Sequence, residues 1–336
     1  MNVHSRRALS VAALFVIAGC SSATAPTGSP VAPAGTSAGQ SGTLVVHRGV
    51  PFIPFAHRNA VPHQSLSAAY STRKSLIFES DQDLAAVNIY QTKKLATNPP
   101  PIATIHAAKG CPYGLAVDKM GTIYVADNCG GNDVEEYAKG QTTMTTSITN
   151  GISNPLGLVI DGSGTLYVSN YPASITEYAF GTTTPSKTIT GGGLTDPFGL
   201  AVDKSGNVYI ADFGANAVFE LPAGGSTVTN MGLSGLGEPI GLAIDNQNGD
   251  LWETDGSGDA INIYKLGGST SPIKTIAGNE YPYGISLENI GKPKDEVVES
   301  DVDSHAVYGF KPNQYSSFAT LTNGVELPTG VLITKP

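Results

Sequence analysis

The stretch Pro112–Asp127, PYGLAVDKMGTIYVAD, decides the fold of this 336-residue chain. Two short apolar segments, Leu115–Val117 and Ile123–Ala126, each end in an aspartate, and the connection between them contains a glycine. β-branched and aromatic residues favour strands, and glycine favours a tight turn. The stretch therefore predicts two antiparallel strands introduced by a Pro-x-Gly triplet.

The Pro-x-Gly triplet recurs along the chain at a nearly constant interval. It lies at 112–114, 155–157, 197–199, 239–241, 282–284 and 328–330, in steps of 43, 42, 42, 43 and 46 residues. Further strand patterns follow most triplets, and Ile148, Ile189, Ile276 and Leu321 mark a fourth strand. Four short strands in roughly 42 residues is the period of a propeller blade.

The two ends of the repeat region complement each other. Ile77–Asp81 matches a second strand, Val87–Tyr90 a third and Ile105 a fourth, but no Pro-x-Gly strand precedes them. Pro328–Ile333 is a first strand with nothing after it. The C-terminal strand should complete the N-terminal blade, here blade one, because closure removes exposed sheet edges. An open stack of repeats would need capping units that the sequence lacks.

We therefore predict an all-β fold over residues 67–336: a six-bladed β-propeller of four-stranded blades. The unit resembles the NHL repeat, Pro-x-Gly-Leu-Ala-Val-Asp…Gly-x-Ile-Tyr-Val-Ala-Asp, over about residues 75–335. The resemblance implies a platform that binds protein or RNA. Propellers of similar architecture also include gluconolactonase-like lactonases, a peptide-amidating lyase and a streptogramin lyase, so the fold alone does not fix the function.

The N-terminus is typical of an exported lipoprotein. Arg6 and Arg7 precede an apolar run at 8–18, which is too short to span a bilayer. The next residues, up to Cys20, resemble the bacterial lipobox, which implies a signal peptide at 1–19 and acyl chains such as palmitate on Cys20. The alternative is an ordinary signal peptide with a chance cysteine. In Gram-negative lipoproteins, a residue other than aspartate after the acylated cysteine, here Ser21, is compatible with location in the outer membrane.

The following segments predict a tether and leave one stretch unassigned. Residues 20–45 are almost entirely Ser, Ala, Thr, Pro and Gly after the cysteine, a composition that favours a disordered tether. Residues 46–66 are an extended segment whose packing the sequence does not settle. We expect a protein of the cell envelope, lipid-anchored at the outer membrane or cell surface, and monomeric. A net charge of −9 and the lack of a basic run argue against nucleic acid.

Two cysteines lie inside the repeat region. Cys111 precedes the first strand of blade two and Cys129 follows its second strand, so antiparallel pairing puts both at the same end of the blade. An exported compartment favours oxidation. We predict a disulfide; two free thiols are the alternative.

Acidic residues distinguish one sector of the ring. The second strands of blades two to four have Val125, Val168 and Ile210 at their third position, whereas blades five, six and one have glutamate. One hypothesis is an acidic patch that holds Ca²⁺ through oxygen ligands. The alternative is drift of the repeat, with each glutamate bonded to a neighbouring strand or exposed, and with each aspartate capping a turn. The candidates are Glu79, Glu253 and Glu299 with Asp81, Asp255 and Asp301.

The middle residues of the Pro-x-Gly triplets should ring the mouth of the central channel. An apolar, aromatic mouth is typical of a binding pocket, although the same residues suit simple packing between blades. The candidates for this ligand-binding face are Tyr113, Leu156, Phe198, Ile240 and Tyr283.

No set of catalytic residues is assembled in the sequence. Only His106 and His305 fall in the repeats, in different strand contexts, whereas the lyases of this architecture use histidine. We predict a non-catalytic platform that binds a protein, peptide or glycan. The alternative function is a metal-dependent hydrolase of the gluconolactonase kind, which the three glutamates suggest.

Overall fold

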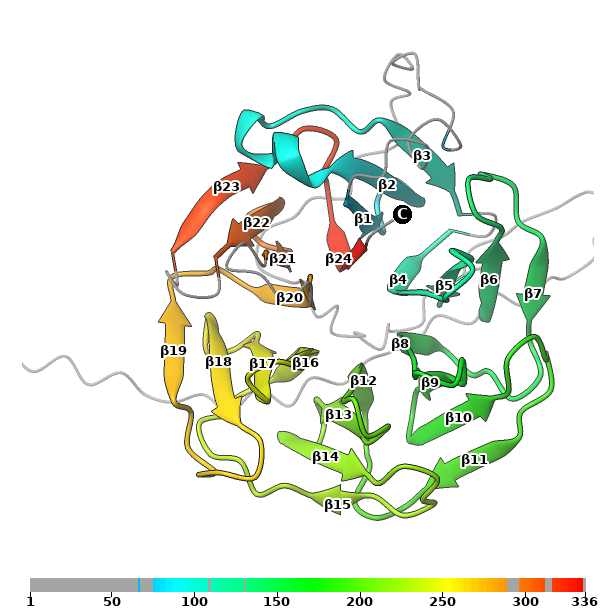
Figure 1. Ribbon diagram of the computed structural model, residues 1–336, viewed down its shortest axis with the longest axis vertical. Helices are drawn as coiled ribbons and strands as arrows, with labels where there is room; N and C mark the ends of the chain where they lie inside the picture. Colours follow the sequence, from blue (N-terminus) through cyan, green and yellow to red (C-terminus); the bar gives the residue numbers. More distant parts are fainter. Residues whose placement is uncertain are drawn as a thin grey trace, which may run out of the picture. The chain divides into compact units, whose positions relative to one another are not determined.

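Six four-stranded antiparallel sheets stand around a common axis in the computed structural model of the chain (Figure 1). The structure describes Leu66 and residues 75–107, 110–129, 131–288, 296–311 and 316–334. Each sheet is one blade, and the first strand of each blade lies nearest the axis. The predicted six-bladed β-propeller is confirmed.

Blade one combines the two ends of the repeat region. Its innermost strand, β24 (Pro328–Thr334), pairs with β1 (Leu76–Asp81), and β2 (Ala86–Gln91) and β3 (Ala103–His106) follow outward. A 3-10 helix, η1 (Thr92–Thr97), lies between β2 and β3. The C-terminal strand therefore closes the ring, as the pattern predicts.

The other five blades use consecutive strands, ordered from the axis outward. They are β4 (Pro112–Val117), β5 (Ile123–Asp127), β6 (Asp133–Tyr137) and β7 (Thr146–Ile148) in blade two; β8 (Pro155–Ile160), β9 (Leu166–Asn170), β10 (Ser174–Tyr178) and β11 (Lys187–Thr190) in blade three; β12 (Pro197–Val202), β13 (Val208–Asp212), β14 (Ala217–Leu221) and β15 (Thr229–Asn230) in blade four; β16 (Pro239–Asp245), β17 (Asp250–Asp255), β18 (Ala260–Lys265) and β19 (Lys274–Ala277) in blade five; and β20 (Pro282–Leu287), β21 (Val297–Asp301), β22 (Ala306–Phe310) and β23 (Ser317–Leu321) in blade six.

The outer strand of blade four has no counterpart among the predicted strand markers. β15 contains two residues, both exposed, and pairs only with Phe219 and Glu220. A strand that buries no side chain leaves no apolar pattern to recognise.

The hydrophobic core lies between neighbouring blades. Tyr124 and Ala126 of blade two pack in one cluster with Leu158 and Val168 of blade three. Second strands are buried on both faces because each stands between two blades; Val125 and Val168 are both fully buried. This explains why second strands read as continuous apolar runs rather than as alternating patterns.

The glycine of each triplet is required by the next blade. A Cβ atom on Gly157 would lie 2.2 Å from the carbonyl oxygen of Phe198, and one on Gly199 would lie 2.2 Å from that of Ile240. Only glycine allows the backbones to approach so closely. A hydroxyl bridges the same junction in blade three, where Ser169 Oγ donates to Phe198 O and accepts from the N–H of Gly157.

Cys111 and Cys129 form the predicted disulfide, with 5.2 Å between their Cα atoms. The bond joins the residue before β4 to the hairpin after β5. It therefore ties together two loops at one end of blade two.

The predicted signal peptide, the acylated Cys20, the tether and residues 46–65 lie outside the described residues. Leu66 is described, is 1% exposed and packs with Leu76 and Phe78 of blade one. No helix among the described residues has the length and apolar character needed to cross a membrane.

Candidate functional site

The two faces of the propeller differ in their loops. In an antiparallel blade, the starts of the first and third strands lie at the same end. The loops before the first strands and the hairpins between second and third strands therefore share one face, which we call the Pro-x-Gly face. The turns between first and second strands and between third and fourth strands form the opposite face.

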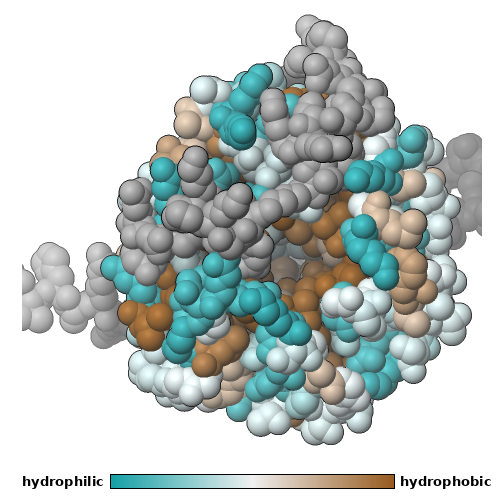
Figure 2. All heavy atoms as spheres, in the orientation of Figure 1, coloured by the Kyte–Doolittle hydropathy of each residue, from teal (hydrophilic) through white to brown (hydrophobic). Residues whose placement is uncertain are grey.

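A central channel runs along the innermost strands. Its volume is about 320 Å³, and residues of β4, β8, β12, β16, β20 and β24 line it. Figure 2 shows hydrophobic residues around the hollow at the centre of one face. Of the middle residues of the triplets named as candidates, Leu156, Phe198, Ile240 and Tyr283 line this channel.

Three aromatic rings meet at the Pro-x-Gly end of the channel. Phe198 and Tyr283 have ring centroids 5.3 Å apart, and Tyr113 lies 6.3 Å from Phe198 and 6.5 Å from Tyr283. These residues come from blades two, four and six, so they touch one another only because they converge on the axis. We call Tyr113, Phe198 and Tyr283 the aromatic triad. Leu156 and Ile240, from the intervening blades, are buried, with exposed fractions of 8% and 1%.

Hydrogen-bond acceptors surround the aromatic triad. Tyr113 donates its hydroxyl to Gln82 Oε1 at 3.3 Å, and burial raises the pKa of Tyr113 to about 12. Tyr281 lies against Tyr283 at 6.4 Å and donates its hydroxyl to Glu238 Oε2 at 3.1 Å. These partners come from loops of different blades, so sequence spacing gave no indication of them.

Asp196, two residues before Phe198, adds a carboxylate near Tyr283. Its negative charge is one cause of the raised pKa of Tyr283, after burial and the neighbouring tyrosines. Burial, followed by the charge of Asp212, raises the pKa of Asp196 itself to about 6. Its Oδ1 atom is buried and has no hydrogen-bond partner among the described residues.

The glutamates of blades five and one are held inside their own blades. Glu253 is fully buried, and its Oε2 accepts a hydrogen bond of 3.1 Å from Asn262 Nδ2 on the adjacent strand. Thr275, on the outer strand, donates to Asn262 Oδ1 at 2.8 Å. Blade one repeats this ladder with Glu79, Asn88 and Thr104.

Glu299 is buried in a different way. It is fully buried as well, but its partner is Asn279, in the loop before β20, at 2.8 Å. Burial is the largest cause of the raised pKa of Glu79, Glu253 and Glu299, and for Glu253 the pKa reaches about 8. The Glu253 carboxyl therefore favours the neutral form near neutral pH.

The aspartates at the ends of the second strands cap loops. Asp255 accepts hydrogen bonds from the backbone N–H groups of Gly237, Glu238 and Gly258 at 2.7 to 2.9 Å. Asp81 and Asp301 bind the equivalent loops in blades one and six. Each aspartate thus joins a hairpin to the loop that precedes its blade.

The proposed Ca²⁺ site does not fit this geometry. Its candidate carboxylates belong to three separate blades, where amides and backbone N–H groups already bind them. Among the residues that the structure describes, no three or more His, Cys, Asp or Glu side chains are grouped so as to hold a metal ion. Glu79 and Glu253 bond within their sheets, Glu299 bonds to a loop residue, and the aspartates cap turns.

A pH-dependent stability is expected from Glu253. Its folded-state pKa of about 8 lies above the ordinary value of 4.5, so the folded protein binds the proton more tightly than the unfolded chain. The free energy of unfolding should therefore fall between about pH 4.5 and pH 8. Glu253→Gln keeps the bond to Asn262 without a titratable group. We expect this variant to be more stable than the parent at pH 8 by about 4 kcal/mol, because one pKa unit corresponds to about 1.4 kcal/mol.

Urea unfolding at pH 4 and pH 8 measures this effect. At pH 4 both proteins carry a neutral side chain and should unfold at the same urea concentration, which serves as the internal control. An equal difference in stability at both pH values would show that Glu253 does not titrate in this window.

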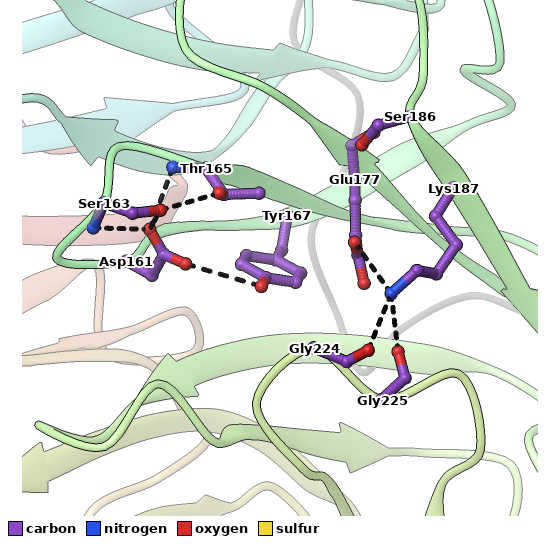
Figure 3. Close-up of polar contacts among 9 residues, drawn as sticks. All are labelled: Asp161, Ser163, Thr165, Tyr167, Glu177, Ser186, Lys187, Gly224 and Gly225. Atoms are coloured by element: carbon purple, nitrogen blue, oxygen red, sulfur yellow. Dashed lines mark hydrogen bonds and ion pairs between the residues drawn. The ribbon is translucent and has the colours of Figure 1, made fainter.

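Opposite-face contacts in blade three are structural in character (Figure 3). Asp161 accepts backbone hydrogen bonds from Ser163 and Thr165 at 2.9 Å and so caps its turn. Lys187 Nζ lies 3.3 Å from Glu177 Oε2 and donates to the carbonyl of Gly225 in blade four at 2.7 Å. The Asp161 contacts stabilise one turn, and the Lys187 contact with Gly225 joins blades three and four.

Comparison with known proteins supports the fold. The chain is similar to a structure described as the crystal structure of a nidogen/laminin complex, with a TM-score of 0.64 and 18% identity over 77% of this chain and 98% of the other. It is also similar to a streptogramin B lyase structure (TM-score 0.48, 15% identity, 60% and 66% of the two chains). A third similar structure is that of a catalytically inactive virginiamycin B lyase from Staphylococcus aureus with quinupristin. Its TM-score is 0.48 and its identity 18%, over 60% of this chain and 67% of the other. No family model matches the chain. No curated protein matches it either.

Proposed function

We propose that the protein is an exported, lipid-anchored binding platform whose Pro-x-Gly face takes a protein, peptide or glycan without converting it. The observation that carries the proposal is the aromatic triad on the propeller axis, bordered by the acceptors Gln82, Asp196 and Glu238. Half-buried aromatic rings beside a few fixed polar groups are the usual composition of a recognition site.

The buried carboxylates support binding rather than hydrolysis. A hydrolase of the lactonase kind needs a metal or an acid–base pair that reaches its substrate. Glu79, Glu253 and Glu299 are fully buried and bonded to asparagines, so they do not reach a ligand on either face.

The nidogen/laminin structure is compatible with a protein partner. Its description names a complex of two proteins, and its fold is shared by this chain. We extend the use of this fold as a protein-binding surface to the present propeller.

Acylation at Cys20 would hold the platform at a membrane of the cell envelope. Two or more acyl chains give stable anchoring, whereas one gives only marginal binding. The segment 20–45 would act as a flexible tether, with an end-to-end distance of about 30 Å for a chain of its length and composition. The propeller would then meet its partners as a monomer beyond the membrane surface.

Peptide and glycan arrays probed with the detergent-solubilised chain test the proposal. We expect a saturable ligand whose affinity falls about fivefold in Phe198→Leu, because an aromatic contact contributes about 1 kcal/mol beyond its buried area. Met120→Ala is the matched control, since Met120 is an apolar side chain, 63% exposed, on the opposite face. Metal-dependent turnover of lactones, or binding that Phe198→Leu leaves unchanged, would contradict the proposal.

A further inference from the structure

The Pro-x-Gly face is strongly acidic. Negatively charged residues lie in the loops of blades one, five and six and in the loop that leads into blade four. Most of these side chains are exposed. Following the chain, these residues are Asp83, Asp196, Glu238, Asp259, Glu280, Asp303 and Glu326.

Lysines are concentrated at the other end of the blades. In the described residues of the Pro-x-Gly loops there is no lysine or arginine; Lys109 belongs to one of these loops but lies outside the described residues. The described ion pairs Lys187–Glu177 and Lys265–Asp250 also lie towards the opposite face. Lysines in or beside the opposite-face turns are Lys93, Lys94, Lys119, Lys139, Lys204, Lys265 and Lys311.

The acidic loops form one sector that reaches the axis. Glu238, Asp259, Glu280 and Asp303 belong to blades five and six and to the loops that lead into them, and Glu326 and Asp83 continue the series into blade one. Tyr281, beside Glu280, links this sector to the aromatic triad through its contact with Tyr283 and its hydrogen bond to Glu238. Charge and aromatic surface are therefore continuous.

Asp196 provides an independent indication at the centre. Its buried Oδ1 has no hydrogen-bond partner among the described residues, and its charge acts on Tyr283 of the triad. A cationic group at the triad would lie against the negative faces of the rings and be attracted by the negative charge of Asp196. A neutral glycan would not be attracted by the negative charge of the surrounding loops, whereas a cationic ligand would be.

We propose that this face binds a cationic peptide segment of a protein partner. One lysine or arginine side chain would sit on the aromatic triad beside Asp196, and further basic side chains would pair with the acidic loops of blades five, six and one. This inference rests on the proposed function and specifies its ligand. Charge complementarity selects the partner and speeds its approach, while the desolvated contact at the triad provides the larger share of affinity.

A titration of the detergent-solubilised full chain with fluorescently labelled deca-lysine tests the inference. Deca-glutamine serves as the neutral peptide. The test variant is Glu238→Gln/Glu280→Gln/Asp303→Asn on the Pro-x-Gly face. The matched control, Glu136→Gln/Glu220→Gln/Asp250→Asn, removes the same number of charges from the other end of the blades. A third variant, Phe198→Leu, removes one ring of the triad.

We expect deca-lysine to bind and deca-glutamine not to bind. The Pro-x-Gly variant should weaken deca-lysine binding about tenfold and reduce its salt dependence, as expected for the loss of three surface charge pairs. The control variant should change affinity less than about twofold, because its charges lie towards the opposite face and are screened by salt. Phe198→Leu should weaken binding about fivefold while the salt dependence stays the same.

Equal weakening by the two charge variants would overturn the inference, since it would indicate attraction to net charge alone. If the arrays reveal a neutral peptide or glycan ligand and deca-lysine does not bind, the inference fails while the proposed function stands. If neither the arrays nor deca-lysine give saturable binding, both fail.

Discussion

Replacing Gly199 with alanine is expected to lower the melting temperature by about 10 °C or to prevent folding. The new methyl group would lie 2.2 Å from the carbonyl oxygen of Ile240, 2.9 Å from the Cα of Gly241 and 3.1 Å from the backbone nitrogen of Leu242. All three atoms belong to the backbone of the next blade and none is the end of a flexible side chain. The clash can be relieved only by opening the junction, at a cost of about 3 kcal/mol or more.

Gly162→Ala is the control for this prediction. Gly162 lies in a turn of blade three, its φ is outside the left-handed region, and a Cβ atom there would meet nothing within 4 Å. We expect its melting temperature to stay within about 2 °C of the parent, because surface substitutions of this kind change stability little. Both variants would be melted at one scan rate, since unfolding of a protein of this size can be irreversible. Similar melting temperatures for the two variants would refute the close approach between blades.

Deleting residues 328–336 is expected to abolish the folded ring. The deletion removes β24, which pairs with β1 from Leu76 to Asp81 and packs against β4 and β20. β1 would lose its inner partner, and its unpaired edge would promote aggregation. Far-ultraviolet circular dichroism and size-exclusion chromatography measure the outcome.

Two further samples make the deletion informative. Removing residues 335–336 alone leaves β24 intact and should leave the monomer folded. Adding a synthetic peptide with the sequence of residues 328–336 to the longer deletion should restore soluble monomer, because an added strand can complete a sheet. A longer deletion that remains a soluble, cooperatively folding monomer without the peptide would show that strand closure is dispensable.

The fold could be predicted because the same sequence pattern occurs in every blade. Each Pro-x-Gly triplet marks a place where the next blade leaves no room for a Cβ atom, so a glycine is required there in every blade. The pairing of β24 with β1 also followed from counting, since a first strand was missing at one end and left over at the other. β15 was missed because its two exposed residues contribute nothing to the core.

The candidate site was only partly predictable. The middle residues of the triplets were expected at the channel mouth, but the sequence does not show that Tyr113, Phe198 and Tyr283 touch one another. That contact depends on the radius of the ring and on smaller residues in the alternate blades. The hydroxyl partners Gln82 and Glu238 come from distant loops, and no spacing rule links them to the rings.

The glutamates that suggested the acidic sector do not gather in one site. Glutamates in the second strands of blades five, six and one suggested a shared Ca²⁺ site, but period-two alternation does not reveal that both faces of these strands are buried between blades. The glutamates are fully buried, and the exposed negative charge lies in the loops. Those loop acids could have been assigned to one face from the predicted topology alone.

Hydrogen–deuterium exchange of the full chain, with and without deca-lysine, tests the central claim most directly. We expect slower exchange in the loops 231–238, 278–281 and 302–305 and around Phe198, with no change in the opposite-face turns 118–122, 161–165 and 203–207. Protection in those opposite-face turns, or a footprint spread evenly over both faces, would contradict the claim that the Pro-x-Gly face is the binding surface.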